Sequence, residues 1–457
     1  MTFLRKIEQL LFYLLLFSIP FQTRKILWQQ SWYFNEWQAI SIYATDVLLI
    51  VLLLFWALNH IKSSQFSIFP PALLRNAKRA GSFQFQNPNF YLIIFLVISA
   101  ISIKNSSNFT LSIYSFLKLV EFVIFYFYIK SYAIDNFGFI PSLVAIISGA
   151  VFQSVIAVAQ FWKQSGLGLR IFGESLISRD LTGIASFYNL YGERVIRAYG
   201  TTPHPNILAA YLFLAVFAFY FIWLYKGMNK LYLFVYGLIL LAFFFTFARV
   251  MIFLLFLNFL IKALLIRLKF KSEFCPPSAE PGRGRGNKKL VPIVLATLIG
   301  IVVLCVFYWP DIASRIKISA GEEAVQMRIF YGMESLKSGI HWFGIGPGNF
   351  VNRLMVQNPN ISRHLYQPVH NIYLLLYSET GALGISTFLL FLIFLAKDFI
   401  SRTHMEKLYH YSFFLIFLSV LFMGLFDHFL LTLQQGRFIF WLAIALLTQP
   451  LKGNAIF

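Results

Sequence analysis

The stretch from residue 367 to 384, QPVHNIYLLLYSETGALG, combines a histidine with the spacing of a close-packed helix. A helix that begins near Pro368 would place five of its residues on one face: His370, Leu374, Tyr377, Gly381 and Gly384. A neutral imidazole can accept a proton, and glycines allow neighbouring helices to approach closely. The pattern therefore predicts a closely packed helix with a reactive ring near its N-terminus.

Ionisable residues inside apolar runs gather near one end of the predicted membrane spans. Such residues are costly inside a membrane, so their positions are informative about function. Six lie near the predicted outer ends of their spans or just beyond: Asp46, Arg249, His370, Asp427, His428 and Arg437. Lys118 and Glu121 lie deeper, at the i, i+3 spacing of a pair that neutralises itself. This clustering predicts a site at the outer face, acting on something that arrives through the membrane or along its surface.

The composition indicates which class of protein carries these residues. Of the 457 residues, 59% are hydrophobic and 12% are charged, and 54 are phenylalanine. Apolar runs recur at the roughly 20 residues that a membrane-spanning helix needs. We predict an all-α, polytopic integral membrane protein, a single membrane domain over 1–457 with about twelve spans: an N-terminal run to about 21, then 40–58, 90–103, 111–133, 139–161, 206–225, 231–247, 248–267, 290–308, 369–396, 411–431 and 436–449.

Two of these runs need comment. The N-terminal run has a basic start but no small-residue cleavage site, so we expect a retained first helix rather than a signal peptide. The apolar stretch 231–266 is too long for one crossing. We predict two helices there with a turn near Arg249, although no glycine or proline marks it.

Lysine and arginine predict the orientation of the spans. Outside the long loops they concentrate in the segments that lie inside when both termini are cytoplasmic. Two long loops then face outward, 162–205 and 309–368, whereas 268–289 is a basic cytoplasmic linker. Within 309–368 a helix is predicted from about Glu322 to Ser338, with acidic residues at its start.

The spacing His-Asn-x9-Gly-x-x-Gly, at His370, Asn371, Gly381 and Gly384, resembles the signature of the bacterial O-antigen ligase family. Three further elements follow the family's order, and the match covers about 195–390. They are RAYGTTPHPN at 197–206, the Ala-Arg-Val run around Arg249 where the family has Ser-Arg-Gly, and Arg328 followed by GIGPGNF at 344–350. The twelve-span layout is also similar.

The resemblance implies a GT-C-like, metal-independent glycosyltransferase in the cytoplasmic (inner) membrane, with its active site on the extracytoplasmic face. It implies transfer of a glycan from a polyprenyl-diphosphate carrier to a hydroxyl of a lipid or glycan acceptor, without a cofactor and in contact with membrane lipids. Arg249 and Arg328 match positions that contact the diphosphate, and His370 matches the proposed base. A nearby helix start should lower the pKa of His370 and keep it neutral. Five further residues complete the expected substrate-binding set: Arg197, His204, Asn206, Asn371 and Arg437.

Other readings of these residues stay open. His370 can be an interfacial histidine with a structural hydrogen bond, Arg249 can reach lipid headgroups, and Arg328 can lie solvated on its loop. Three residues can simply shape the loop before a span: Arg197, His204 and Asn206. An O-antigen or capsule polymerase and a protein O-oligosaccharyltransferase would share donor and site but differ in acceptor. A secondary transporter or anion carrier is a different class, and its ionisable groups are expected near the bilayer midplane.

Charge and cysteine content argue against other partners. The net charge of +20 is spread between the apolar runs and forms no single basic patch, so no nucleic-acid partner is predicted. No Asp-x-Asp pair occurs, which removes the commonest metal-diphosphate signature. Cys275 lies in a polar loop and Cys305 in an apolar run, so neither a disulfide nor a metal site is expected.

Overall fold

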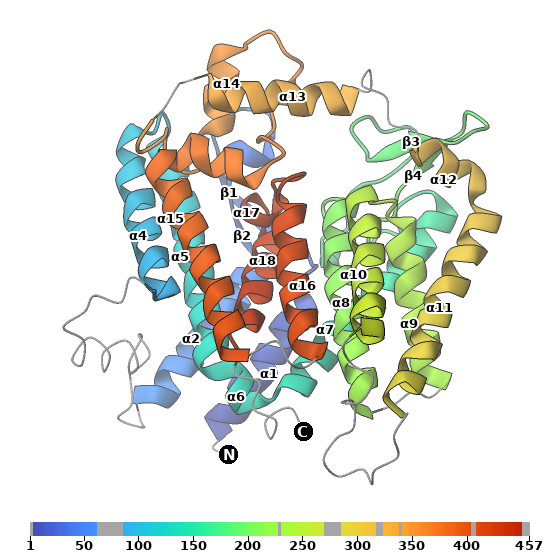
Figure 1. The fold of residues 1–457 in the computed structure, drawn as a ribbon. Helices are drawn as coiled ribbons and strands as arrows, with labels where there is room; N and C mark the ends of the chain where they lie inside the picture. The colour runs from blue at the N-terminus through green and yellow to red at the C-terminus, as the bar shows by residue number, and fades with distance from the viewer. Residues whose placement is uncertain are drawn as a thin grey trace.

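The computed structural model is mostly helical, and its helices form a bundle whose axes run roughly parallel (Figure 1). It describes residues 3–61, 86–226, 230–268, 285–316, 323–337, 341–403 and 408–449. Some features predicted from the sequence lie outside these residues: Cys275, the two ends of the helix 322–338, and most of the linker 268–289.

The helices are, in chain order, α1 (Phe3–Ser18), α2 (Ala44–Ile61), α4 (Pro88–Ser102), α5 (Phe109–Tyr128), α6 (Ile134–Phe137), α7 (Phe139–Lys163), α8 (Pro205–Lys226), α9 (Lys230–Phe245), α10 (Arg249–Leu268), α11 (Arg285–Phe307), α12 (Trp309–Ile316), α13 (Glu323–Leu336), α14 (Phe350–Gln357), α15 (Ile372–Thr403), α16 (Leu408–Met423), α17 (Phe429–Thr432) and α18 (Gln434–Leu447). Two antiparallel hairpins accompany them, β1 (Arg24–Gln29) with β2 (Ala39–Tyr43) and β3 (Ser186–Tyr188) with β4 (Arg194–Ile196).

Among the described residues, five helices are long and apolar enough to cross a membrane, or six if the pair α11–α12, bent by 95°, counts as one span. The five are Pro88–Asn105, Phe109–Phe137, Phe139–Lys163, Pro205–Trp223 and Ile372–Arg402. Four shorter apolar helices lie beside them: Ala44–Asn59, Lys230–Phe245, His410–Met423 and Gln434–Leu447. A mostly helical chain with several candidate membrane spans is therefore confirmed, whereas the number of twelve spans stays a prediction.

The centre of the bundle is α8, and its composition explains that position. Within its apolar window, 89% of the residues are buried inside the protein. A helix that is hydrophobic on every side is typical of a fully surrounded position. Six helices pack against it: α7, α9, α10, α11, α16 and α18. The loop that leads into α8 is thereby fixed at one end of the bundle.

The predicted break in 231–266 is present, between α9 and α10, and it sets the position of Arg249. The turn is Thr246-Phe247-Ala248, and Phe247 has a positive φ of 45°. A bulky residue rarely adopts this conformation unless its surroundings hold it. The Phe247 ring lies 4.8 Å from that of Phe187 and 5.8 Å from that of Phe161. These aromatic contacts hold Phe247 in a backbone conformation that is usually adopted by glycine. Arg249 follows this turn as the first residue of α10.

The helix after His370 differs from the prediction in two ways. α15 begins at Ile372 rather than near Pro368, and it breaks at Gly381, whose φ of 76° and ψ of −175° are not helical. His370 therefore precedes the helix, and the expected single stripe from His370 to Gly384 is wrong. The break accommodates the backbone of Trp342, because a Cβ atom added at Gly381 would lie 2.3 Å from the Trp342 carbonyl oxygen.

The loop 344–350 packs against the same break. Gly344 has a φ of 66°, and an added Cβ there would lie 2.4 Å from the Glu379 carbonyl carbon. The amide of Ile345 donates to the Ser378 carbonyl at 3.0 Å. A side chain at Gly344 or Gly381 would collide with the opposing backbone, so the close approach requires glycine at both positions.

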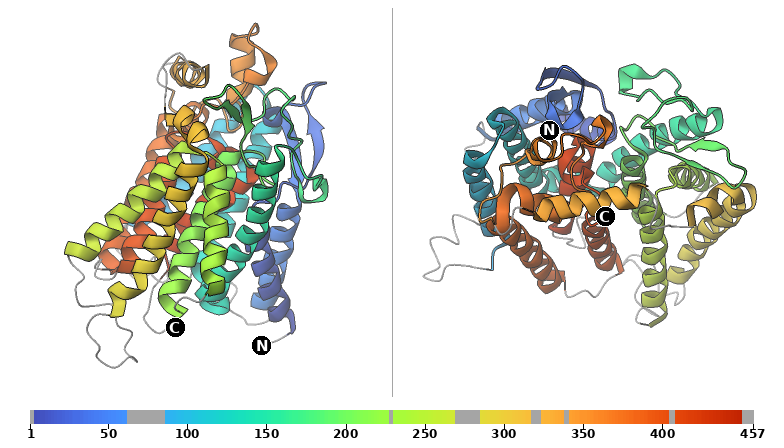
Figure 2. Two further views of the ribbon diagram at one scale, coloured as in Figure 1. Left: turned by 90° about the vertical axis from the view of Figure 1, so that its right-hand side faces the viewer. Right: turned by 90° about the horizontal axis from the view of Figure 1, so that it is seen from above.

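We call the end of the bundle that carries α13, α14 and both hairpins the loop end; α1 begins and α18 ends at the opposite end (Figure 1). Seen from above, α13 lies across the loop end (Figure 2). It confirms the helix predicted in 309–368. The hairpins depart from the all-α prediction. β3 and β4 have only three residues each, the sequence RKILWQ of β1 does not alternate, and β2 overlaps the apolar run predicted as the span 40–58.

Candidate active site

A cavity of about 990 Å³ opens at the loop end, and residues distant in sequence line it. Arg249 comes from the start of α10, Arg328 from α13 and His370 from the segment before α15. Three of the predicted substrate-binding residues line it too: Arg197, His204 and Asn206. The structure therefore brings together six of the eight residues selected from the sequence.

A chain of hydrogen bonds joins three residues of the cavity lining, Arg197, Asn206 and Asp427. The Arg197 guanidinium donates from Nε to the Thr246 carbonyl at 2.5 Å and from Nη2 to Asn206 Oδ1 at 2.6 Å. The Asn206 amide in turn donates to Asp427 Oδ2 at 2.8 Å. Burial, followed by the charge of Arg315, lowers the pKa of Arg197 to about 9, so it keeps its charge at neutral pH. Arg197 thus ties the turn before α10 to the entry of α8.

His370 is held between two rings. The Tyr331 ring stacks on it with centroids 5.7 Å apart and planes at 14°, and the His428 ring lies edge-on at 4.9 Å and 77°. The Nδ1 atom of His370 is buried and has no hydrogen-bond partner among the described residues. The His370 ring lines the cavity.

Burial is the main reason that His370 is neutral. It lowers the pKa of the imidazole from its usual value, Asp427 raises it and Arg328 lowers it again, with a net decrease. The direction agrees with the sequence prediction, but the cause is burial rather than the helix start. A neutral imidazole at physiological pH is the form that a general base needs.

Two more histidines and a carboxylate surround His370. Burial lowers the pKa of both His204 and His428 to about 3. The backbone N–H of Asn206 donates to His204 Nδ1 at 3.1 Å, and His428 Nδ1 lies 2.8 Å from Thr432 Oγ1. Burial alone would raise the pKa of Asp427, but the histidines and the Asn206 side chain lower it to about 2. At neutral pH Asp427 is therefore an anion, whereas His204 and His428 are neutral.

Five arginines line the cavity, against two carboxylates: Arg197, Arg249, Arg315, Arg328 and Arg363 face Glu36 and Asp427. Glu36 forms an ion pair with Arg24. The excess of positive charge suits an anionic ligand, and guanidinium forks match phosphate oxygens. Charged or titratable lining residues that are absent from the predicted site include Arg315, Arg363, Asp427 and His428. His428 was visible as an ionisable residue at a span end, whereas nothing distinguished Arg315 from other basic residues of its loop.

Two predicted substrate-binding residues do not line this cavity. Asn371 caps α15, since its Oδ1 accepts from the amides of Tyr373 and Leu374 at 2.9 and 3.1 Å, and its amide donates to the Leu425 carbonyl at 3.2 Å. Arg437 lines a separate cavity of about 130 Å³, and its Nε donates to the Leu431 carbonyl at 2.7 Å. Neither residue therefore lines the arginine-lined cavity: Asn371 caps α15, and Arg437 lines the smaller cavity.

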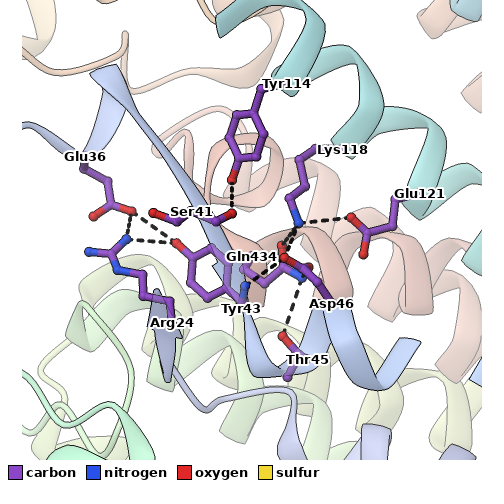
Figure 3. Close-up of polar contacts among 10 residues, drawn as sticks. All are labelled: Arg24, Glu36, Ser41, Tyr43, Thr45, Asp46, Tyr114, Lys118, Glu121 and Gln434. Atoms are coloured by element: carbon purple, nitrogen blue, oxygen red, sulfur yellow. Dashed lines mark hydrogen bonds and ion pairs between the residues drawn. The ribbon is translucent and has the colours of Figure 1, made fainter. Parts of the chain in front are cut away.

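A buried polar network supports the hairpin wall of the cavity (Figure 3). Lys118 Nζ lies 2.5 Å from Asp46 Oδ2 and 3.0 Å from Glu121 Oε2, and the Gln434 side chain donates to Asp46. The predicted Lys118–Glu121 pair is present, but Asp46 is closer, so one cation joins two carboxylates. Tyr114 donates from its hydroxyl to the Ser41 carbonyl at 2.8 Å. The network joins α2, α5, α18 and β2.

Over the described parts of the chain, no three His, Cys, Asp or Glu side chains are grouped so that they could hold a metal ion. Cys305 is a free, half-buried thiol. The arrangement can bind a diphosphate through arginines and offer a neutral imidazole to a hydroxyl group. No known family model matches the chain, and no curated protein sequence is significantly similar to it.

Proposed function

We propose that this protein is a metal-independent membrane glycosyltransferase of the O-antigen ligase type. It moves a glycan from a polyprenyl-diphosphate carrier to a hydroxyl of a lipid or glycan acceptor. The observation that carries the proposal is that Arg249, Arg328 and His370, from three separate elements, line one cavity at the loop end. Packing alone does not require these three residues to meet.

The arginines act on the donor. Arg249 and Arg328 bind the diphosphate oxygens, and Arg315 adds a third guanidinium from α12. When the bond between the anomeric carbon and the diphosphate oxygen breaks, the diphosphate leaves with the electron pair. Cations placed in advance stabilise that charge more in the transition state than in the ground state. A diphosphate is already a good leaving group, so no general acid is required.

His370 acts on the acceptor. The acceptor oxygen attacks the anomeric carbon, and Nε2 of His370 takes the hydroxyl proton as the new glycosidic bond forms. Asp427 and His428 stabilise the imidazolium that results, through charge and ring contact respectively. The proton then leaves to solvent through the open cavity.

The proposal includes the topology expected from the sequence: about twelve spans in a GT-C-like arrangement in the cytoplasmic membrane. Both termini would be cytoplasmic and the cavity would open on the extracytoplasmic face. Two facts support it. The beginning of α1 and the end of α18 lie at the end of the bundle opposite the cavity (Figure 1). The cavity itself lies at one end of the bundle rather than at mid-depth, where a carrier would bind its substrate.

The decisive experiment is to delete the gene, restore it as wild type or as His370→Ala, and identify the lipid-linked glycan that accumulates. A ligase or protein oligosaccharyltransferase predicts accumulation of a finished glycan in both the deletion and the variant. A polymerase predicts a single repeat unit instead. A normal lipid-linked pool in the deletion strain would reject glycan transfer and favour an anion carrier.

A further inference from the structure

The turn of the hairpin β1–β2 carries three consecutive aromatic residues at the mouth of the arginine-lined cavity. Trp32 is 80% exposed and Phe34 is 48% exposed. Tyr33 and Phe34 belong to the cavity lining, whereas Trp32 lies just outside it, beside Tyr33. Single exposed aromatic residues are common, but adjoining ones form a patch of the kind that marks binding sites.

Arg363 completes this surface from the opposite segment. Its guanidinium carbon lies 4.9 Å from the centroid of the Trp32 ring and 4.7 Å from that of Tyr33. The two aromatic rings are perpendicular, with centroids 5.5 Å apart and planes at 82°. Arg363 also lines the cavity. We call Trp32, Tyr33 and Arg363 the aromatic platform.

The platform is held in place before any ligand arrives. The amide of Gln30 donates to the Gln38 carbonyl at 3.0 Å, and the Ser31 hydroxyl donates to Gln38 Oε1 at 2.7 Å. Asn35 accepts from the Trp37 amide at 2.9 Å and donates to the Tyr366 carbonyl at 3.4 Å. These bonds close the turn and tie it to the segment that carries Arg363, so the platform loses little freedom on binding.

The cavity has room for more than a diphosphate. Its volume of about 990 Å³ is at the upper end of the roughly 300–1,000 Å³ that holds a drug-sized ligand. Arg249 and Arg315 line it from α10 and α12, whereas Tyr33 lines it from the hairpin and Arg363 from the segment before α15. From above, the hairpin and α12 lie on different sides of the loop end (Figure 2). A ligand bound by both sets is anionic at one end and stacks on aromatic rings at the other.

We propose that the aromatic platform binds the glycan of the donor, in the part next to the diphosphate; this inference rests on the proposed function. A sugar ring has a face of C–H groups that stacks on an aromatic ring, and hydroxyl groups at its edge. Trp32 offers the exposed ring, and Arg363 and the Tyr33 hydroxyl offer polar partners. The platform thus selects carriers that bear sugar over carriers that do not.

The test measures binding of two probes to the full chain in lipid nanodiscs. One probe is undecaprenyl diphosphate, and the other is the undecaprenyl-diphosphate-linked glycan purified from cells that produce this protein. Trp32→Ala should weaken binding of the glycan-bearing probe about 3- to 10-fold, as expected for one lost aromatic contact. It should leave binding of the bare probe unchanged. Trp32→Phe should retain most of the affinity.

Trp28→Ala is the matched control, because Trp28 lies on β1 of the same hairpin, is 39% exposed and is not part of the aromatic platform. It should bind both probes as the wild type does. Equal weakening of both probes by Trp32→Ala would make Trp32 a lipid or phosphate contact and overturn the inference, as would no weakening at all. Failure of the wild type to bind either probe would overturn the proposed function itself.

Discussion

His370 and His428 lie edge to face, with ring centroids 4.9 Å apart, although His370 precedes α15 and His428 follows α16 in the sequence. Tyr331 stacks on the His370 ring at 5.7 Å. A ring held by two neighbours has few orientations, and a base acts only when its nitrogen is aligned with the proton that it removes. The geometry therefore favours a positioned base at His370 over a structural histidine.

Replacing His370 by alanine should lower glycan transfer by about 10²–10⁴-fold, the usual range for loss of a positioned base. Binding of the glycan-bearing carrier should be nearly unchanged, because the base need not touch the diphosphate before reaction. Purified protein in nanodiscs allows binding and transfer to be measured separately. His341→Ala, at an exposed histidine outside the cavity lining, is the control. Wild-type transfer by His370→Ala would make the histidine structural.

Arg249 should not tolerate lysine. Arg249→Lys keeps the positive charge but loses the planar fork, so transfer should fall despite the retained charge. Arg249→Ala should weaken both donor binding and turnover, because a phosphate clamp acts before and during bond cleavage. The same binding and transfer assays measure both effects. Arg170→Lys, at an exposed arginine distant from the cavity lining, should be silent; full activity in Arg249→Lys would exclude bidentate phosphate binding.

The helices could be predicted because an apolar run of sufficient length is a local feature of the sequence. Even the break before Arg249 was expected, since a single helix would have been too long. Its atomic cause was not, because Phe247 is held by rings from α7 and β3 that no local pattern reveals. The same limit applies to Arg315, which reaches the cavity only through the sharp bend between α11 and α12.

Two predicted site residues lie outside the arginine-lined cavity for a different reason. Asn371 adjoins His370 in the sequence, but adjacency does not give a shared direction, and its side chain caps α15 instead. An asparagine before an apolar run is itself a cap signal, so the sequence contained this answer. Arg437 lies at a span end like Arg249, but a separate cavity receives it. Depth in the membrane is predictable from one sequence, whereas position around the bundle is not.

The transfer rate should fall at acidic pH with a midpoint below 6.5. Burial lowers the pKa of His370 below that ordinary value, with Asp427 raising it and Arg328 lowering it. A base is lost as the pH falls through its pKa, so the wild type should keep its rate at pH values where a free histidine is half protonated. Asp427→Asn should move the midpoint lower, and Arg328→Ala should move it higher. Profiles of kcat/KM against pH test this, because they report the pKa of the protein without donor, and an unmoved midpoint in both variants would exclude His370 as the titrating base.

Transfer should persist in the presence of a chelator. The cavity lining contains five arginines to neutralise a diphosphate, so the proposed reaction does not need a divalent ion for charge. The measurement is the rate of glycan transfer with and without EDTA, after dialysis of protein and donor. Loss of activity in EDTA, restored by added magnesium or manganese, would contradict this prediction.

The meeting of two backbones at Gly381 should matter for stability. Gly381→Ala places a Cβ atom 2.3 Å from the Trp342 carbonyl oxygen and forces a side chain into a φ of 76°, so the loop 341–350 must shift. A lower unfolding temperature in detergent is expected, together with reduced transfer, because this loop leads into the outer segment that reaches His370. Gly237→Ala is the matched control, since nothing lies within 4 Å of an added Cβ there. Alanine is also the better helix former, so Gly237→Ala should leave the unfolding temperature equal or slightly higher. Equal unfolding temperatures for Gly381→Ala and the wild type would mean that the loop does not depend on this close approach.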